Sequence, residues 1–187
     1  KRNYQEFIDN NIIPCLPRGT EGLYLMGKAG FFQALGLTQI EEDLKRQTPL
    51  FLGNYPNVLI DIANGHMAKL VEIVKQIKHR WPWTQLMVGN VAHPLTYKNL
   101  AMAGADYVRI SIGTGAGCTT AANVAINYPM GSLITECHKI KKECELETKI
   151  VADGGMQGYD DIIKALALGA DYVMVGSLFN KAMQSAG

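Results

Sequence analysis

One cysteine of the chain stands in a glycine-rich segment that suits covalent chemistry. The segment "SIGTGAGCTT" (111–120) directly follows the apolar run "YVRI" and places Cys118 beside two threonines. A cysteine becomes a nucleophile when its thiolate is stabilised and accessible, and the neighbouring glycines give the backbone access to positive φ angles. The carbonyls and amides of such a loop can also bind an ion. A glycine-rich turn with an incidental cysteine is the alternative that composition alone leaves open.

A second group of candidate residues closes two later apolar runs. "VADGG" (151–155) ends one run with an acid and two glycines, and "MVGS" (174–177) ends the next with a glycine and a hydroxyl. Backbone amides at such strand ends can hold a phosphate, beside a carboxylate that can accept hydrogen bonds from ribose hydroxyls. The pattern predicts a mononucleotide site that includes Asp153. A helix N-cap or turn role is the alternative for this residue.

From residue 57 onward, short apolar runs alternate with amphipathic segments. The expected strands are 57–62, 85–91, 106–111, 149–155 and 171–177, and the helices expected between them are 66–81, 94–104, 131–145 and 159–169. Strands that are apolar throughout and alternate with helices are typical of a parallel sheet. The similar stretches "AGADYV" (103–108) and "LGADYV" (168–173) predict the same turn twice, with a glycine ending each helix. This repetition favours the βα units of a barrel over a doubly wound sheet.

We therefore expect an α/β fold, a (β/α)8 TIM barrel that is incomplete in this chain, as a single catalytic domain over residues 1–187. An eight-unit barrel typically needs about 200 to 250 residues, more than the 187 present. Residues 1–56 show no clear βα rhythm, apart from a short strand within 10–18 and a helix over 40–46. In a barrel the carboxyl ends of all strands meet at one rim. Five polar residues end the expected strands and should gather there: Asp61, Asn90, Ser111, Asp153 and Ser177.

Composition argues against several classes of partner. The chain has 18 Lys and Arg against 17 Asp and Glu, with no long run of one sign, so we expect neither nucleic acid nor a membrane surface as a partner. No apolar stretch approaches the roughly 20 residues that span a bilayer, and the first ten residues have no apolar signal core. The four cysteines lack metal-ligand spacing, which predicts a reducing, cytoplasmic location. Cys137 and Cys144 share one helical stripe and are expected in the core.

Five motifs in order carry a resemblance to a known family. "NVLIDIANGH", "VGNVA", "AGADYVRISIGTGAGCTT", "VADGG" and "IIKALALGADYVMVGSLF" together resemble the inosine monophosphate dehydrogenase / guanosine monophosphate reductase family over roughly residues 57–180. "IIPCLPR" (12–18) resembles an earlier piece of the same barrel. The resemblance implies an NAD(P)-dependent oxidoreductase that acts at C2 of a purine mononucleotide (GMP or IMP) through a cysteine thioimidate. It further implies NADP(H) or NAD(H) as cofactor, potassium as activator and a homotetramer.

The resemblance also implies the catalytic and cation-binding residues. Cys118 corresponds to the nucleophile, and Thr120 to the threonine that assists proton transfer at the leaving group. The backbone carbonyls of Gly113, Gly115 and Cys118 correspond to ligands of a monovalent cation.

Two further sets of residues are implied by the same resemblance. The nucleotide-binding positions are Asp153, Gly154, Gly155, Gly176, Ser177 and Asn90. The positions on the nicotinamide side are Asp61, Ile62, Ala63, Ile112 and Gly113.

The chain departs from the family pattern at several positions, which indicates a divergent member. Thr114 replaces a usual proline, Ala116 a phosphate-binding serine and Ala121 a frequent arginine. Asn64 in "DIANGH" resembles the reductases, whereas dehydrogenases more often have histidine or glutamine there. GMP reductase is therefore the predicted activity.

Three alternatives stay open. The first is an IMP dehydrogenase. The second is a degenerate relative that binds purine nucleotides without turnover, which Ala116 favours and the intact Cys-Thr-Thr sequence (118–120) opposes. The third is a flavin-dependent barrel enzyme, which would explain the phosphate motifs but not "GAGCTT".

Overall fold

The fold is a single parallel sheet whose strands follow one another in the order of the chain. A computed structural model describes residues 3–20, 30–113 and 127–179. The sheet has seven strands, each hydrogen-bonded to its neighbours in sequence: β1 (Cys15–Leu16), β2 (Phe32–Leu35), β3 (Asn57–Asp61), β4 (Gln85–Val91), β5 (Tyr107–Ile110), β6 (Lys149–Asp153) and β7 (Tyr172–Met174). All described ladders are parallel. This order is that of a TIM barrel, and no described ladder joins β1 to β7, so the barrel is partial.

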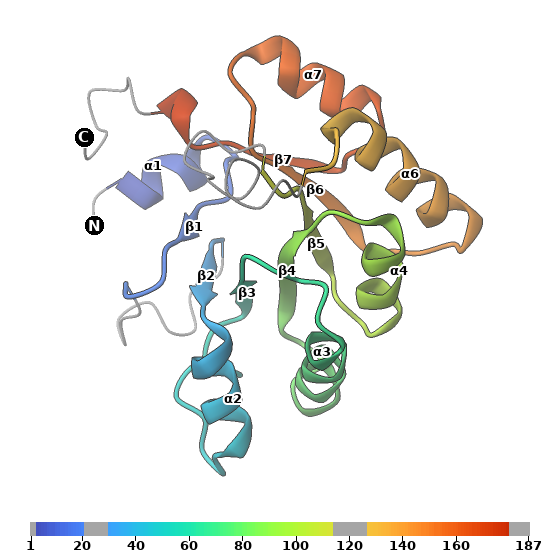
Figure 1. Cartoon of the computed structure of the whole chain (residues 1–187). Helices are drawn as coiled ribbons and strands as arrows, with labels where there is room; N and C mark the ends of the chain where they lie inside the picture. The colour runs from blue at the N-terminus through green and yellow to red at the C-terminus, as the bar shows by residue number, and fades with distance from the viewer. Residues whose placement is uncertain (1–2, 21–29, 114–126, 180–187) are drawn as a thin grey trace.

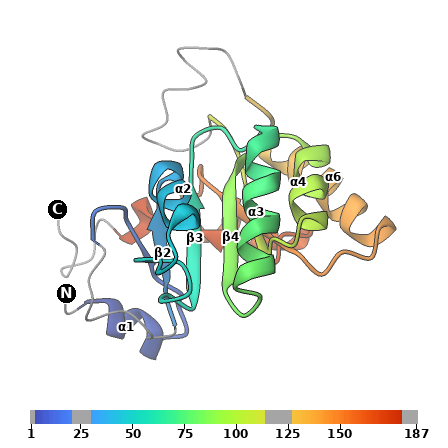
Figure 2. The same cartoon turned by 90° about the horizontal axis from the view of Figure 1, so that it is seen from below.

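Helices cover the outer face of the curved sheet (Figure 1). They are α2 (Leu37–Lys45), α3 (Ala68–Arg80), α4 (Pro94–Met102), α6 (Met130–Glu143) and α7 (Tyr159–Ala167), whereas α1 (Asn3–Asp9) and a short 3-10 helix, η2 (Ser177–Phe179), lie at the open side. Figure 2 shows α3, α4 and α6 side by side on this face. At the open side, Phe7 of α1 contacts Phe179 of η2 edge to face, with ring centroids 5.3 Å apart.

The strands send alternate side chains to two separate apolar layers. In β3, Val58 and Ile60 pack toward the helices in the larger cluster, while Leu59 points into the barrel interior. The interior cluster also contains Phe32 and Met87, with Tyr107 packed against it. Because the period of a strand is two residues, strands buried on both faces must be apolar throughout, which is the pattern that the sequence shows.

Every strand and helix expected from residue 57 onward is present. The strand expected over 171–177 is shorter, because the chain turns into η2 at Ser177. The amino-terminal part is more regular than the sequence indicated: α1 and β2 were not expected, and α2 begins at Leu37 rather than at residue 40. Cys137 is buried as expected, whereas Cys144 is only partly buried because it caps the end of α6.

The repeated sequence "GADYV" has the same structural role at β5 and β7. Gly104 ends α4 with a φ of 104°, which glycine adopts without strain. Asp106 then accepts hydrogen bonds from Nζ of Lys78 on α3 (2.9 Å) and from the backbone N–H of Leu86 on β4 (2.7 Å). One carboxylate thus joins the start of β5 to the preceding strand and its helix.

The second copy of this turn repeats the glycine conformation and both kinds of hydrogen bond to the aspartate. Gly169 has a φ of 112°, and Asp171 accepts hydrogen bonds from Lys141 on α6 (2.7 Å) and from the backbone N–H of Ile150 on β6 (2.7 Å). In both copies the lysine comes from the helix that precedes the strand donating the N–H. The sequence repeat is therefore a repeated βα unit, anchored at the amino ends of its strands.

A buried carboxylate joins α2 to the segment that leads into β3. Asp43 is 1% exposed and accepts the backbone N–H groups of Leu50 (2.8 Å), Phe51 (2.6 Å) and Leu52 (2.8 Å). Hydrogen bonds to a charged acceptor are worth more than neutral ones, and buried donors left without an acceptor are costly. Asp43 therefore joins the helix that was expected over 40–46 to a segment, residues 50–52, for which the sequence predicted no element.

We expect the Asp43→Ala variant to lose about 3 kcal/mol of unfolding free energy, because it leaves these donors without their acceptor. Its neighbour Glu42 is exposed on the same helix, so Glu42→Ala should change stability by less than about 0.5 kcal/mol. Urea denaturation of both variants measures the difference. Equal stability of the two variants would contradict the assigned role of Asp43.

Candidate active site

Polar residues from neighbouring strands meet at the carboxyl edge of the sheet. Asp61 ends β3, Asn90 lies near the end of β4 and Asp153 ends β6. All three contact the side chain of Arg109, which comes from the middle of β5. The convergence of Asp61, Asn90 and Asp153 was expected from the strand order, but the arginine between them was not.

The guanidinium of Arg109 directs each of its three nitrogens at a different strand. Nη1 lies 3.2 Å from Oδ1 of Asp61, Nη2 donates a hydrogen bond to Oδ1 of Asn90, and Nε lies 3.3 Å from Oδ2 of Asp153. The side chain of Arg109 is only 13% exposed, so these ion pairs are partly shielded from water. The Nε–H has no well-aligned hydrogen-bond acceptor among the described residues, although Asp153 is within ion-pair distance.

Two more contacts extend this group, which we call the rim cluster (Arg18, Asp61, Asn90, Arg109 and Asp153). Nδ2 of Asn90 donates a hydrogen bond of 2.8 Å to Oδ2 of Asp153. Nε of Arg18 lies 3.4 Å from Oδ2 of Asp61. Two arginines thus face two aspartates, and the charges of the cluster balance.

A β-bulge places Asn90 in the rim cluster. Gly89 pairs with Arg109 and Val91 with Ile110, so Asn90 is the extra residue of β4. Such a bulge re-aims a side chain at the edge of a sheet. Glycine is required at 89, because a Cβ there would overlap the backbone and Cβ of Arg109.

The turn after β3 is held against the same bulge. The N–H of Gly65 donates to the carbonyl of Asn90 (2.9 Å), and a Cβ at position 65 would lie only 2.7 Å from that oxygen. Oδ1 of Asn64 accepts the N–H of His66 (3.0 Å), and Ile62 exchanges backbone hydrogen bonds with β4. These contacts explain the sequence "DIANGH" as a turn that approaches β4 closely.

A cavity of about 300 Å³ opens above the rim cluster. It is lined by the rim cluster and by Ile62, Ala63, Ser111, Ile112, Gly113 and Gly154. All five residues predicted for the nicotinamide side therefore share one cavity with three predicted for the nucleotide: Asn90, Asp153 and Gly154.

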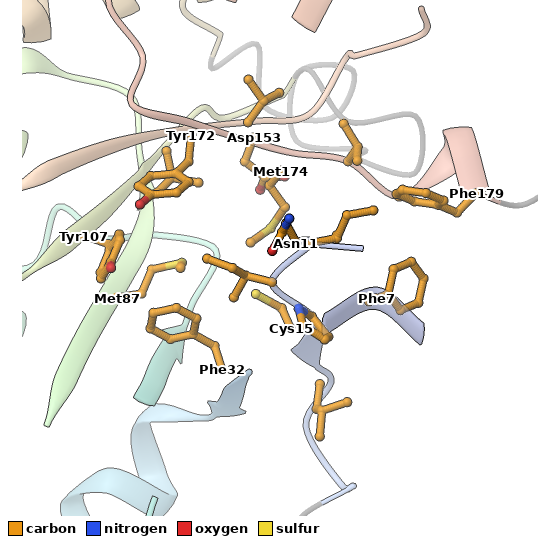
Figure 3. Close-up of a pocket in the computed structure, with 18 of the residues that line it drawn as sticks. Phe7, Asn11, Cys15, Phe32, Met87, Tyr107, Asp153, Tyr172, Met174 and Phe179 are labelled. Atoms are coloured by element: carbon orange, nitrogen blue, oxygen red, sulfur yellow. The ribbon is translucent and has the colours of Figure 1, made fainter. Parts of the chain in front are cut away.

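A second, larger cavity of about 1220 Å³ lies in the open interior of the barrel. Figure 3 shows Phe32, Met87 and Tyr107 facing it from β2, β4 and β5. Asp153 lines both cavities, and Gly176 lines the larger one. Burial raises the pKa of the Cys15 thiol in this cavity to about 11, so Cys15 stays protonated near neutral pH and is a poor nucleophile.

Several predicted site residues lie elsewhere. Gly155 and Ser177 line neither cavity; both are exposed, and Ser177 begins η2 instead of ending a strand. Cys118, Thr120 and Gly115 lie outside the described residues, so their roles stay predictions. Of the predicted cation ligands only Gly113 is described, with a φ of 87°.

Comparison with known proteins decides the family. A family model described as "IMP dehydrogenase / GMP reductase domain" matches residues 31–187. The chain belongs to this family. It is 40% identical over 130 residues to inosine-5'-monophosphate dehydrogenase of Chlorobaculum parvum, covering 70% of this chain and 26% of that protein. It is 33% identical over 150 residues to GMP reductase 1 of Homo sapiens, covering 79% and 43%.

A solved structure agrees with this assignment. A GMP reductase from Trypanosoma brucei matches with a TM-score of 0.68 and 27% identity, over 79% of this chain and 32% of that one. The chain thus spans less than half the length of these relatives. The family resemblance and the partial TIM barrel expected from the sequence are both confirmed.

In this member of the family, sequence reasoning missed Arg109 and Arg18. Arg109 interrupts the apolar run "YVRI", where the neighbouring Val108 and Ile110 are buried. A charged residue that alternates with buried ones points to the opposite face of the strand, here the interior, and must be paired there. That alternation was the available signal. Arg18 carries no comparable signal, because it stands in a proline-containing turn.

Neither a candidate metal cluster nor a candidate membrane-spanning helix is found among the described residues. Within residues 3–20, 30–113 and 127–179, no three histidine, cysteine or acidic side chains gather as metal ligands. The same segments include no helix with the length and apolar character that a bilayer crossing requires.

His66 joins the turn after β3 to the turn after β4. Its Nε2 accepts the backbone N–H of Ala92 (3.0 Å), and its Nδ1 lies 2.8 Å from Oγ1 of Thr96. Because Nε2 is an acceptor, the ring is neutral and Nδ1 carries the proton. Partial desolvation by the packed turns, and secondarily the neighbouring His93, lowers the pKa of His66 below its ordinary 6.5, although the residue is partly exposed.

A histidine whose pKa is lowered by folding stabilises the protein above the unfolded pKa. As the pH falls through 6.5 the unfolded chain takes up the proton first, so stability declines until the folded group is protonated as well. We expect His66→Gln to show a smaller drop in melting temperature between about pH 7.5 and about pH 5.5 than the unaltered protein. His79→Gln, which removes an exposed imidazole on α3, is the control. If the melting temperature of His66→Gln falls with pH as much as that of the unaltered protein, His66 does not cause the loss of stability.

Proposed function

We propose that the protein is a purine-nucleotide oxidoreductase, most specifically a GMP reductase that converts GMP and NADPH to IMP, ammonia and NADP. The observation that carries this proposal is the shared contact of Asp61 and Asp153 with Arg109. Asp61 is assigned to the nicotinamide side and Asp153 to the nucleotide side. Ligands held by these two residues would meet in one cavity, as hydride transfer requires.

The nucleotide would be bound mainly by residues that follow β6 and β7. Asp153 offers a carboxylate for the ribose hydroxyls. Gly154 and Gly155 have φ values of 92° and 79°, a conformation that suits glycine and leaves backbone amides accessible to a phosphate. Gly176 has nothing within 4 Å of the position of a Cβ, so a phosphate can approach its backbone. Ser177 adds a hydroxyl donor next to it.

The residues above the rim cluster fit a nicotinamide ring. Ile62 and Ile112 give apolar walls, and Ala63 and Gly113 leave room for a flat group. A bound reduced nicotinamide supplies a hydride. The role of the protein is to place this donor beside C2 of the purine and to exclude water.

Cys118 is the proposed nucleophile. Its thiolate attacks C2 of GMP, and the exocyclic amino group leaves as ammonia after protonation assisted by Thr120. The resulting thioimidate receives the hydride at C2, and the bond between C2 and sulfur then breaks to give IMP and the free thiolate. Covalent catalysis of this kind divides one difficult displacement into two easier steps.

IMP dehydrogenase is the second candidate, in which IMP, NAD and water give XMP and NADH. The higher identity to the Chlorobaculum dehydrogenase favours it, whereas Asn64 favours the reductase. We further propose potassium bound by the carbonyls of Gly113, Gly115 and Cys118, a homotetramer, and a cytoplasmic location.

The stoichiometry at C2 separates the two activities. A reductase releases one ammonia for each NADPH consumed with GMP, and it forms little XMP from IMP and NAD. We expect this result when ammonia and NADPH are measured in the same reaction. Steady XMP formation without ammonia from GMP would establish the dehydrogenase, and nucleotide binding without either reaction would establish a non-catalytic relative.

We expect Cys118→Ala to lower turnover by at least about a thousandfold, because no other step can form the thioimidate. GMP affinity should change by less than about threefold, since Asp153 and the glycines after it remain. Cys144→Ala, at a partly exposed thiol on α6, is the control and should keep full activity. Turnover in Cys118→Ala comparable to that of the control is incompatible with covalent catalysis at this residue.

A further inference from the structure

Arg109 is the physical link between the two halves of the proposed site. Its Nη1 pairs with Asp61 at 3.2 Å and its Nε lies 3.3 Å from Asp153. The guanidinium is planar and rigid, so its nitrogens cannot move independently. A displacement of one aspartate therefore changes the contact that the other aspartate makes.

The contact with Asp153 is the more easily altered of the two. Nε lies at ion-pair distance from Oδ2 of Asp153 but has no aligned acceptor, and the same oxygen already accepts a 2.8 Å hydrogen bond from Asn90. A ribose that binds Asp153 would change the position of this carboxylate or offer Nε an acceptor of its own. Either change would reorient the guanidinium plane, and this would alter the contact between Nη1 and Asp61.

The surroundings of Arg109 allow a shift of Asp153 to reach Asp61 without being absorbed by solvent or by movement of the backbone. Arg109 is 13% exposed, so water screens its ion pairs only in part. Its backbone is fixed by pairing with Gly89 on β4 and Val151 on β6. Arg18, by contrast, is 59% exposed and contacts Asp61 alone within the cluster.

We propose that Arg109 is a positioning residue that couples the binding of the purine nucleotide to the binding of the nicotinamide dinucleotide. The inference rests on the proposed function, in that it takes Asp153 as the nucleotide ligand and Asp61 as a residue of the dinucleotide side. It goes beyond that function because it makes the two affinities interdependent. Such coupling is reciprocal: each ligand changes the affinity for the other by the same factor.

The test is the dissociation constant of GMP, measured by calorimetry with and without saturating NADP, a pair that cannot react. In the unaltered protein the two values should differ by about tenfold. Arg109→Lys keeps the charge but cannot hold three partners with one ammonium, so the two values should agree within about twofold. Arg80→Lys is the matched control, because it makes the same replacement on α3, where Arg80 bonds backbone carbonyls outside the rim cluster, and it should keep the tenfold difference.

Asp61→Asn gives a second, independent reading that does not require substitution of Arg109. It alters the dinucleotide side alone, yet through Arg109 it should shift GMP affinity measured without NADP by about threefold or more. In the double variant with Arg109→Lys this shift should disappear. Thermal unfolding of each variant verifies that the fold is retained.

The outcomes separate this inference from the proposed function. If the unaltered protein binds GMP and NADP independently, or if Arg109→Lys keeps the coupling, the inference is overturned and the proposed function stands. If the unaltered protein binds neither GMP nor IMP, the proposed function fails, and the coupling fails with it.

Discussion

A charge held inside the sheet organises the carboxyl edge of this protein. Arg109 is more buried than the two aspartates that pair with it, and burying a cation without compensation is costly. The compensation comes from three neighbouring strands, which supply two carboxylates and an amide oxygen to one guanidinium. Several local features follow from this need. The bulge at Asn90 brings its amide within reach, and the glycine at 89 lets β4 approach the backbone of Arg109.

The same arrangement explains why the proposed nucleotide and nicotinamide sides lie so close together. The strand order β3, β4, β5 and β6 fixes the sequence of side chains along the rim, and the arginine draws them to one point. Because Asp61 and Asp153 share Arg109, a substitution on one side of such a site also affects the other side. The family contains both dehydrogenases and reductases, which share this need to bring a purine and a nicotinamide together.

The sequence predicted the regular part of the fold and the meeting of polar side chains at the carboxyl edge of the sheet, for identifiable reasons. Fully apolar strands that alternate with helices specify a parallel sheet, and parallel strands align their polar ends, so the meeting of Asp61, Asn90 and Asp153 was predictable. β2 was missed because Gln33, fully buried and bonded to the backbone, breaks its apolar run. The role of Asp43 was missed because its carboxylate accepts hydrogen bonds from backbone N–H groups, which no side-chain pattern reveals. Arg109 was missed because its pairing depends on residues far away in the sequence.

The two anchoring turns lie at the opposite end of the sheet from the rim cluster. Asp106 and Asp171 hold the starts of β5 and β7 through partners that the rim cluster does not share. Energetic effects at sites without common partners are close to additive. Sequence changes in the rim cluster therefore place no demand on these anchors. In evolution, residues at the carboxyl edge of such a sheet can change and alter the chemistry, while the anchors at the amino ends of the strands remain the same.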